Sequence, residues 1–534
     1  MIIPPEQAPS IASQILQMRV AEQARLRRIG KYVDGKHDPP YTPRGVNAEY
    51  RWISKRAKRN FLPLIVSVLS QNLHVDGYRR SGETTDETVS TDNPEPSWEA
   101  FRANRMISRQ HGVHRSVIKY GLAYVTVLPG QMSTDEEQPQ NVPVIRPASP
   151  RRMTALYADD VDDEWPLLAV DVRVVNDAKA PGKQRRIVSL YDENSRYILT
   201  GNVANDSFDV DIADEDDPFL GGQAPVADHG LGVCPVVRFL HEADLDGEAD
   251  CVGEIEPIIP IQDQINFSTF NLMITEQFAA FRQRWVTGML PVDEEGRETQ
   301  PFKPGVDRVW VGEDPNTRFG EFSESSLQGN LDSREAGIRH MSTVTQVPPY
   351  HLLGQIANLS AEALAAARDG LDRKVEELQA VNTDPWRNTM RLTAKAAGDK
   401  DGWNDLNGTI IWRDTSARAF GATIDGLTKA AQMLGVPQEE LWRRIPGVTA
   451  DDVASWLLAK QRADAQAVVQ QAVAGAQGPS TPPGATPGAG PGAPGAAPPS
   501  AAGAAGTLPP TVPGGPALGA AQAFLATPPP GGNT

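Results

Sequence analysis

Two histidines one helical turn apart are the first residues whose type and spacing could do chemistry. His111 and His114 fall on one face of a predicted helix, where such a pair could bind a metal ion. No third ligand follows at a suitable spacing, so we interpret both as structural histidines. Asp244–Asp250, DLDGEAD, is similar to part of a calcium loop but lacks the bidentate glutamate that completes one, and it predicts a turn. We therefore expect no metal and no cofactor.

Motifs for phosphate binding and nucleophilic catalysis are absent from the sequence. There is no GxxxxGK(S/T) loop to hold a nucleotide and no GxSxG turn to present a serine. Gly230 and Gly232 lack the third glycine of a dinucleotide site and precede a predicted strand. The five basic residues from Arg51 to Arg59 could meet phosphate, but we favour a solvated helix face or a contact with an acidic neighbour. The sequence predicts a protein that is not an enzyme.

Composition limits the class of partner. The chain has 534 residues and a formal net charge of −17, so tight binding of nucleic acid is not expected. Its two cysteines make no disulfide framework and suit a reducing compartment. The first residues show no signal-peptide pattern, and no run of eighteen apolar residues is present, so we predict no membrane partner.

Periodicity predicts an α+β fold with helices at both ends of a β-rich region. Apolar residues recur at helical spacing in some segments and alternate in others. Helices are predicted over about 8–32, 48–73, 98–119, 261–281, 327–345, 360–382, 384–397, 425–434, 438–444 and 450–474, and strands in GLAYVTVL, LLAVDVRVV, RIVSLYD, CPVVRFL, WVTGML, RVWVG and RFGEF. Gly77 is expected to mark a turn. Residues 477–534, rich in Gly and Pro and without charge, are predicted to be disordered.

An apolar segment with a glycine joint lies between two of the predicted helices. Pro348 and Pro349 must end the helix before it, because proline has no N–H and clashes with the preceding turn. Gly354 supplies a joint before the next helix. The segment's residues are Pro348, Tyr350, His351, Leu352, Leu353, Gln355, Ile356 and Asn358.

The order of these pieces, with several local motifs, resembles the phage portal proteins, the head-to-tail connectors of tailed phages. The resemblance is to the siphovirus type common in phages of actinobacteria and covers roughly residues 8 to 470. It rests on HRSVIKYGLAYVTV, HGLGVCPVVRF, GEIEPIIPIQDQIN, EQFAAFRQRWVTG and VPPYHLLG with NLSAEAL. The matching residues are His114, Tyr120, Gly121, Ala123, Tyr124, Val125, Gly230, Gly232, Pro235, Val236, Val237, Gly253, Glu254, Gln262, Asp263, Asn266, Glu276, Arg284 and Gly288.

The resemblance implies a division of the chain into named parts. It implies N-terminal helices and wing in 1–253, stem helix 1 in 254–283, clip in 284–325, stem helix 2 in 326–345, channel loop in 346–359, long helix in 360–382, wing remainder and helical crown in 383–476, and tail in 477–534. Stem packing is expected from Ile265, Phe270, Met273 and Phe278, which need neighbouring subunits to cover them. Partner contacts in the clip are expected at Arg297 and Glu313.

The function implied is a ring of about twelve subunits at one capsid vertex, closed by heterologous contacts. The ring would surround double-stranded DNA during packaging and ejection, without sequence-specific contacts, and would bind the terminase large subunit and head-tail adaptor proteins. Major capsid and scaffold proteins are further implied partners, and synthesis in the host bacterial cytoplasm precedes incorporation in the virion. A net negative ring suits DNA that must slide, because an attractive wall would hold it.

Two other functions stay open on the sequence alone. A soluble cytosolic enzyme could use residues 346–359 as an apolar lid, which predicts a pocket with convergent polar groups. A minor capsid or scaffold component would share the virion but would form no closed ring. The segment itself could also be an ordinary buried connector with Leu352, Leu353 and Ile356 in the core, whereas the channel interpretation places these side chains partly exposed in the lumen.

Overall fold

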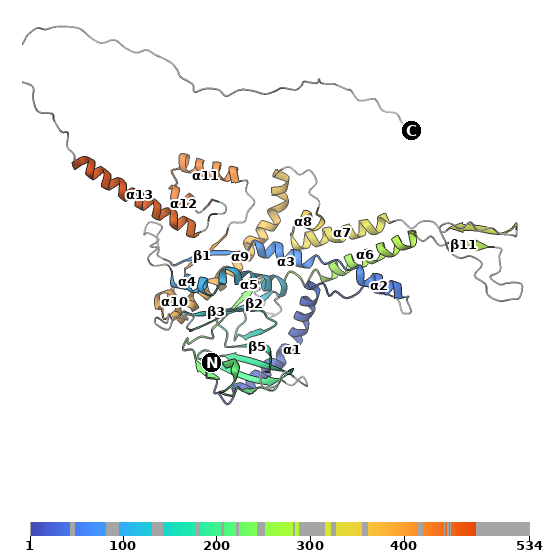
Figure 1. Ribbon diagram of the computed structural model, residues 1–534, viewed down its shortest axis with the longest axis horizontal. Helices are drawn as coiled ribbons and strands as arrows, with labels where there is room; N and C mark the ends of the chain where they lie inside the picture. The colour runs from blue at the N-terminus through green and yellow to red at the C-terminus, as the bar shows by residue number, and fades with distance from the viewer. Residues whose placement is uncertain are drawn as a thin grey trace, which may run out of the picture. The chain divides into compact units, whose positions relative to one another are not determined.

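The computed structural model describes most of the chain as far as residue 476 (Figure 1). The described residues are 2–42, 48–81, 95–130, 142–177, 182–203, 208–220, 224–242, 251–280, 284–287, 315–321, 327–354, 361–413, 420–442, 444–445, 448 and 450–476. The chain divides into two compact units, Met1–Ala467 and Val468–Thr534. Of the second unit, the structure describes the end of one helix. The predicted disordered tail therefore lies outside the described residues.

Among its described residues, the N-terminal third contains five helices, two more than the sequence predicted. They are α1 (Ala8–Val33), α2 (Ala48–Arg56), α3 (Leu62–Gln71), α4 (Pro96–Ala103) and α5 (Met106–Tyr120). The helix predicted over 48–73 is broken, because Pro63 occupies the first turn of α3 and cannot continue an earlier helix. The helix predicted over 98–119 is broken at Arg105, whose φ of 57° is left-handed.

The strands form small antiparallel sheets, which supports the predicted α+β class. One sheet has the order β10-β2-β3 and a larger one the order β4-β5-β6-β7-β8, with β9 also paired to β7. Their bounds are β2 (Leu122–Leu128), β3 (Val144–Ala148), β4 (Met153–Leu156), β5 (Leu168–Asn176), β6 (Gln184–Tyr191), β7 (Ser195–Asn202), β8 (Asp211–Ile212), β9 (Val226–Asp228) and β10 (Val236–Leu240). Strand β2 is buried along its whole length, because one of its faces packs in a cluster with α5 and the other in a cluster with residues of β4, β5 and β6.

A further strand pair joins distant parts of the chain. β1 (Val75–Arg79) runs antiparallel to β13 (Thr409–Trp412). Gly77 therefore lies within a strand, and the predicted turn there is wrong. The pairing slips between Val75 and Gly77, so the glycine marks a bulge instead.

The long helix α9 (Ala361–Ala397) is continuous, whereas the sequence predicted two helices. Pro385 lies inside it and removes one backbone hydrogen bond, but it does not end it. Trp386, the next residue, is fully buried, so packing holds the helix through the proline. Shorter helices follow: α10 (Lys400–Asn404), α11 (Phe420–Leu434), α12 (Gln438–Trp442) and α13 (Ala450–Ala476).

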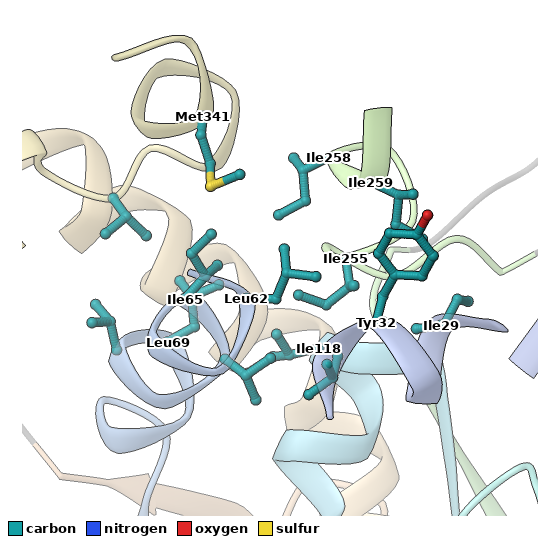
Figure 2. Close-up of a cluster of buried hydrophobic side chains, with 14 of the residues drawn as sticks. Ile29, Tyr32, Leu62, Ile65, Leu69, Ile118, Ile255, Ile258, Ile259 and Met341 are labelled. Carbon is teal, nitrogen blue, oxygen red and sulfur yellow. The ribbon is translucent and has the colours of Figure 1, made fainter. Parts of the chain in front are cut away.

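The central core lies where the N-terminal helices meet α6 (Ile259–Ala280), α7 (Gln328–Thr345) and α9. Figure 2 shows Ile29 and Tyr32 of α1, Leu62 and Ile65 of α3 and Met341 of α7 turned toward one another. The residues just before and at the start of α6 enter the same cluster, as do three from α9. These residues are Ile255, Ile258, Ile259, Leu371, Val375 and Leu378. The core therefore anchors one end of both α6 and α7.

Candidate functional site

Helices α6 and α7 form an antiparallel hairpin that continues into a two-stranded ribbon (Figure 1). The two helices approach closely at Gly337, where an added Cβ would lie 2.9 Å from Cγ1 of Ile265. Two polar contacts continue the pairing outward: Ser268 Oγ lies 3.1 Å from Ser333 Oγ, and the Asn330 amide donates to Thr275 Oγ1 over 3.2 Å. Beyond the helices, β11 (Arg284–Thr287) pairs with β12 (Arg318–Glu321).

The other side of α6 is covered by α2 of the same chain. Phe270 packs with Ile53 of α2 and with Ala57, the residue after α2, and Met273 packs against this cluster. Ile265 is fully buried and Phe270 is 5% exposed within one subunit. The prediction that neighbouring subunits cover Ile265 and Phe270 is therefore wrong, because an apolar position does not reveal which chain covers it. The side chain of Phe278 lies outside the described residues.

Two amides on the first turns of α6 bind the backbone that precedes α3. The Gln262 side chain accepts a hydrogen bond from Phe61 N over 3.2 Å and donates to the carbonyl of Arg59 over 2.5 Å. Asn266 Oδ1, one turn later, accepts from Arg59 N over 2.9 Å. Both amides are almost completely buried. Because buried amides need every partner, these bonds set the register of α6 against residues 59–61.

A histidine and a tyrosine extend this network to α1. His37 Nε2 donates to the carbonyl of Tyr32 over 2.9 Å, so Nδ1 is the acceptor for the Asn266 amide at 3.0 Å. Burial lowers the pKa of His37, which suits this neutral tautomer. Tyr32 donates to Asp263 Oδ2 over 3.0 Å, and burial together with that carboxylate raises the pKa of Tyr32 to about 12.

A buried ion pair connects α6, α7 and α9. Lys374 Nζ of α9 lies 2.6 Å from Glu254 Oε2, just before α6, and 3.4 Å from the carbonyl of Thr345, the last residue of α7. His241 Nε2 is 3.5 Å from the same carboxylate oxygen, at the limit of a hydrogen bond. Burial alone would raise the pKa of Glu254, but the contacts with His241 and Lys374 outweigh it and the pKa is lowered. We call this set (Glu254, Lys374, His241 and Thr345) the latch.

Two glycines bring Glu254 into place. A Cβ added to Gly253 would lie 2.5 Å from Gly121 N, and one added to Gly121 would lie 2.3 Å from the carbonyl oxygen of Cys251. Gly121 also has a φ of 83°, which favours glycine. The backbone at residue 121 and the backbone at residues 251–253 can therefore approach this closely only because residues 121 and 253 have no Cβ. Glu254 N then donates to the carbonyl of Ile118 over 2.9 Å.

The comparisons with known proteins agree with this architecture. Residues 13–466 match the family model described as phage portal protein, SPP1 Gp6-like. The chain belongs to the phage portal protein family. It is 25% identical over 432 residues to the portal protein of Mycobacterium phage D29, covering 79% of this chain and 82% of that one. It is 24% identical over 378 residues to the portal protein of Mycobacterium phage L5, covering 68% and 71%.

The apolar segment of this portal protein differs from the expected loop. Residues Pro349–Leu353 form a short helix, α8, which ends at Gly354 with a φ of 67°. Leu352 is 7% exposed in the central core, so its predicted partial exposure in a lumen is wrong. Leu353 is partly buried and packs against the same core. Pro348 is buried, Tyr350 is half-buried and His351 is exposed. Gln355, Ile356 and Asn358 lie outside the described residues.

The other chemistry-bearing residues take structural places where the structure describes them. His114 is fully buried: Nδ1 donates to the Leu73 carbonyl over 3.0 Å and Nε2 accepts from Trp386 Nε1 over 3.1 Å. Both ring nitrogens are occupied, which confirms His114 as a structural histidine, and burial lowers its pKa to about 3. His111 Nε2 lies 3.3 Å from His74 Nδ1.

No group of three or more metal-binding side chains occurs within the described ranges. Among the helices that the structure describes, none is long and apolar enough to cross a membrane. A surface hollow of about 440 Å³ is lined by residues 38–41, 263, 264, 266 and 267, and residues 346–354 take no part in it. Asp244–Asp250, Arg297 and Glu313 lie outside the described residues, so their predicted roles stay predictions.

Proposed function

We propose that this chain assembles into a closed ring of about twelve copies at one capsid vertex, where it forms the channel for double-stranded DNA during packaging and ejection. The observation that carries the proposal, beside membership of the portal family, is the surface of the hairpin. Helix α6 has only two charged residues among its 22, Asp263 and Glu276. Phe267 is 44% exposed on α6, and Leu331 and Val344 of α7 are 38% and 50% exposed. Exposed apolar side chains of this kind are typical of protein interfaces.

The ribbon end of the hairpin is the proposed docking platform for the terminase large subunit and the head-tail adaptor. Trp285 and Phe319 are 38% and 40% exposed there, and exposed aromatic side chains are favoured anchors at interfaces. The proposal places Arg297 and Glu313 among the contacts. It assigns no catalysis to the ring, and ATP turnover belongs to the terminase.

The segment after α8 is the proposed channel-facing part. Leu352 anchors α8 in the core, and the left-handed joint at Gly354 leads into residues 355–360. In this proposal Gln355, Ile356 and Asn358 face passing DNA without fixed polar contacts. A ring of carboxylates at Ile356→Asp would repel phosphate in a confined space and should reduce the DNA packaged, whereas Ile356→Ser should reduce it less.

Electron microscopy of the purified protein, with its mass in solution, tests the proposed function. We expect closed rings of one subunit number, and a mass equal to that number of chains, under several salt conditions. A sharp monomer mass at micromolar concentration would overturn the ring and would favour the enzyme alternative. Open or irregular assemblies would favour a scaffold component.

A further inference from the structure

Helix α6 is flanked by α2 on one side and by α7 on the opposite side. The residues of α6 that contact α7 are Ile265, Ser268 and Thr275. On its other side, Phe270 and Met273 pack with Ile53 of α2, and Asn266 bonds to the backbone of Arg59. At 100° per residue these two sets lie on opposite faces of the helix. The layer α2–α6–α7 therefore has two different outer faces, as a head-to-tail ring contact requires.

The outer face of α2 is basic. Ile53 is buried toward α6, so Lys55, two residues further along α2, points away from α6 and is exposed. Arg59 follows three residues after the end of α2, and it is exposed as well. Trp52 is 53% exposed beside them, with the Arg56 guanidinium 3.9 Å from its ring centroid. In a chain of net charge −17, residues 51–59 hold five basic residues and no acidic one.

The outer face of α7 at the same height is acidic and partly apolar. Asp332 and Glu335 are turned away from α6, and Leu331 beside them is 38% exposed. Asp332 accepts from the Gln328 amide and Glu335 pairs with Arg339, all on the exposed surface. Two contacts with α6 fix the position of this face along the helix: Ser333 meets Ser268, and Asn330 meets Thr275. Phe270, which α2 covers, lies between Ser268 and Thr275 on α6, so the faces of α2 and α7 lie at the same position along it.

We propose that the α2 face of one subunit docks on the α7 face of the next, a contact that rests on the proposed ring. Lys55 and Arg59 meet Asp332 and Glu335 of the second copy, and Trp52 meets Leu331. A half-exposed tryptophan beside basic side chains suits a protein partner better than duplex DNA, whose bases are not free to stack on it.

Charge exchange tests the pairing on the full-length chain. Lys55→Glu with Arg59→Glu should raise the protein concentration for half-assembly about tenfold, and Asp332→Lys with Glu335→Lys should do the same. The chain that carries all four substitutions should assemble near the wild-type concentration. A matched control, Arg373→Glu with Asp369→Lys, reverses an exposed pair on α9 and should change nothing. Unchanged assembly in both reversed chains, or no recovery in the exchanged one, would overturn the contact.

A disulfide test separates this contact from the ring itself. With α6 between them, α2 and α7 of one chain are about 16–20 Å apart, beyond the roughly 7 Å that a disulfide spans. Oxidised Lys55→Cys/Asp332→Cys protein should therefore give a ladder of linked chains up to the ring number, absent from wild type. Wild-type rings in micrographs without a ladder would overturn the contact and leave the proposed function standing. Absence of wild-type rings would overturn both.

Discussion

Replacing Lys374 by Met removes the cation of the latch and leaves a carboxylate in the interior. Glu254 is 7% exposed, and Lys374 Nζ lies within 2.7 Å of both its oxygens. Removing one partner of a buried ion pair costs about 3–5 kcal/mol, because the remaining charge is neither solvated nor paired. Removing both charges in Glu254→Gln/Lys374→Met should cost less than the single substitution, by about 1–3 kcal/mol.

The stability difference between Lys374→Met and wild type should depend on pH, and the pKa of Glu254 sets the direction of that change. In the wild type the pKa of Glu254 is lowered, so its contribution to stability is present above the ordinary glutamate pKa and is lost as pH falls below it. Without Lys374, only the contact with His241 opposes the effect of burial, so we expect the pKa of Glu254 to rise. The folded variant then takes up a proton more readily than the unfolded chain. The stability difference between Lys374→Met and wild type should therefore shrink as pH falls from about 7 to 5.

The assay is chemical denaturation followed by circular dichroism at fixed protein concentration, at both pH values, for wild type, the single variant and the double variant. Fixed concentration matters because assembly adds to apparent stability. A stability difference that stays constant between the two pH values would refute the account of a buried, unpaired carboxylate. So would a double variant that is no more stable than Lys374→Met, because the two side chains would then act independently.

Three further predictions follow from burial and composition. Leu352→Ala should lower the free energy of unfolding by about 2–5 kcal/mol while His351→Ala changes it little, and equal effects in denaturation would contradict the buried α8. Burial lowers the pKa of His114 to about 3, so the contribution of neutral His114 to the free energy of unfolding should be complete above about pH 6.5. Below that pH the free energy of unfolding should fall by up to about 1.4 kcal/mol per pH unit, and a free energy that stays constant from pH 6.5 to 5 would contradict the buried, neutral histidine. Removing residues 478–534 should leave ring formation and the melting temperature nearly unchanged, and failed assembly would show that the tail docks on the body.

Segments with a clear period were predictable from the sequence, and helix breaks were not. Alternation located β2, β5 and β6, and the sequence also placed β10, α1 and α7. Pro63 was a visible sign of the break before α3, whereas the left-handed Arg105 leaves no compositional sign. The predicted break between the helices 360–382 and 384–397 does not occur, although Pro385 lies close to it, because the buried Trp386 holds the helix. At Pro385, tertiary packing therefore overrides local propensity.

The candidate site was predictable as positions but not as contacts. The resemblance singled out Glu254, Gln262 and Asn266, and all three prove to be buried and bonded. Their partners are far away in the chain: Lys374 is 120 residues from Glu254, and Arg59 is 207 from Asn266. A single sequence contains no signal for pairs at such separations. The same limit misplaced Phe270, since its cover is α2 of its own subunit.

Helix α9 is long enough to contribute to two separate hydrophobic cores of the subunit. Its first half supplies Leu371 and Val375 to the central core, and its second half supplies Trp386 and Met390 to a separate cluster with Phe101. At 1.5 Å per residue its 37 residues form a rod of about 55 Å. Unfolding either core would release half of α9, so we expect both cores to unfold in a single calorimetric transition. A mechanical force applied to one end of α9 would likewise be transmitted along the helix to the other core.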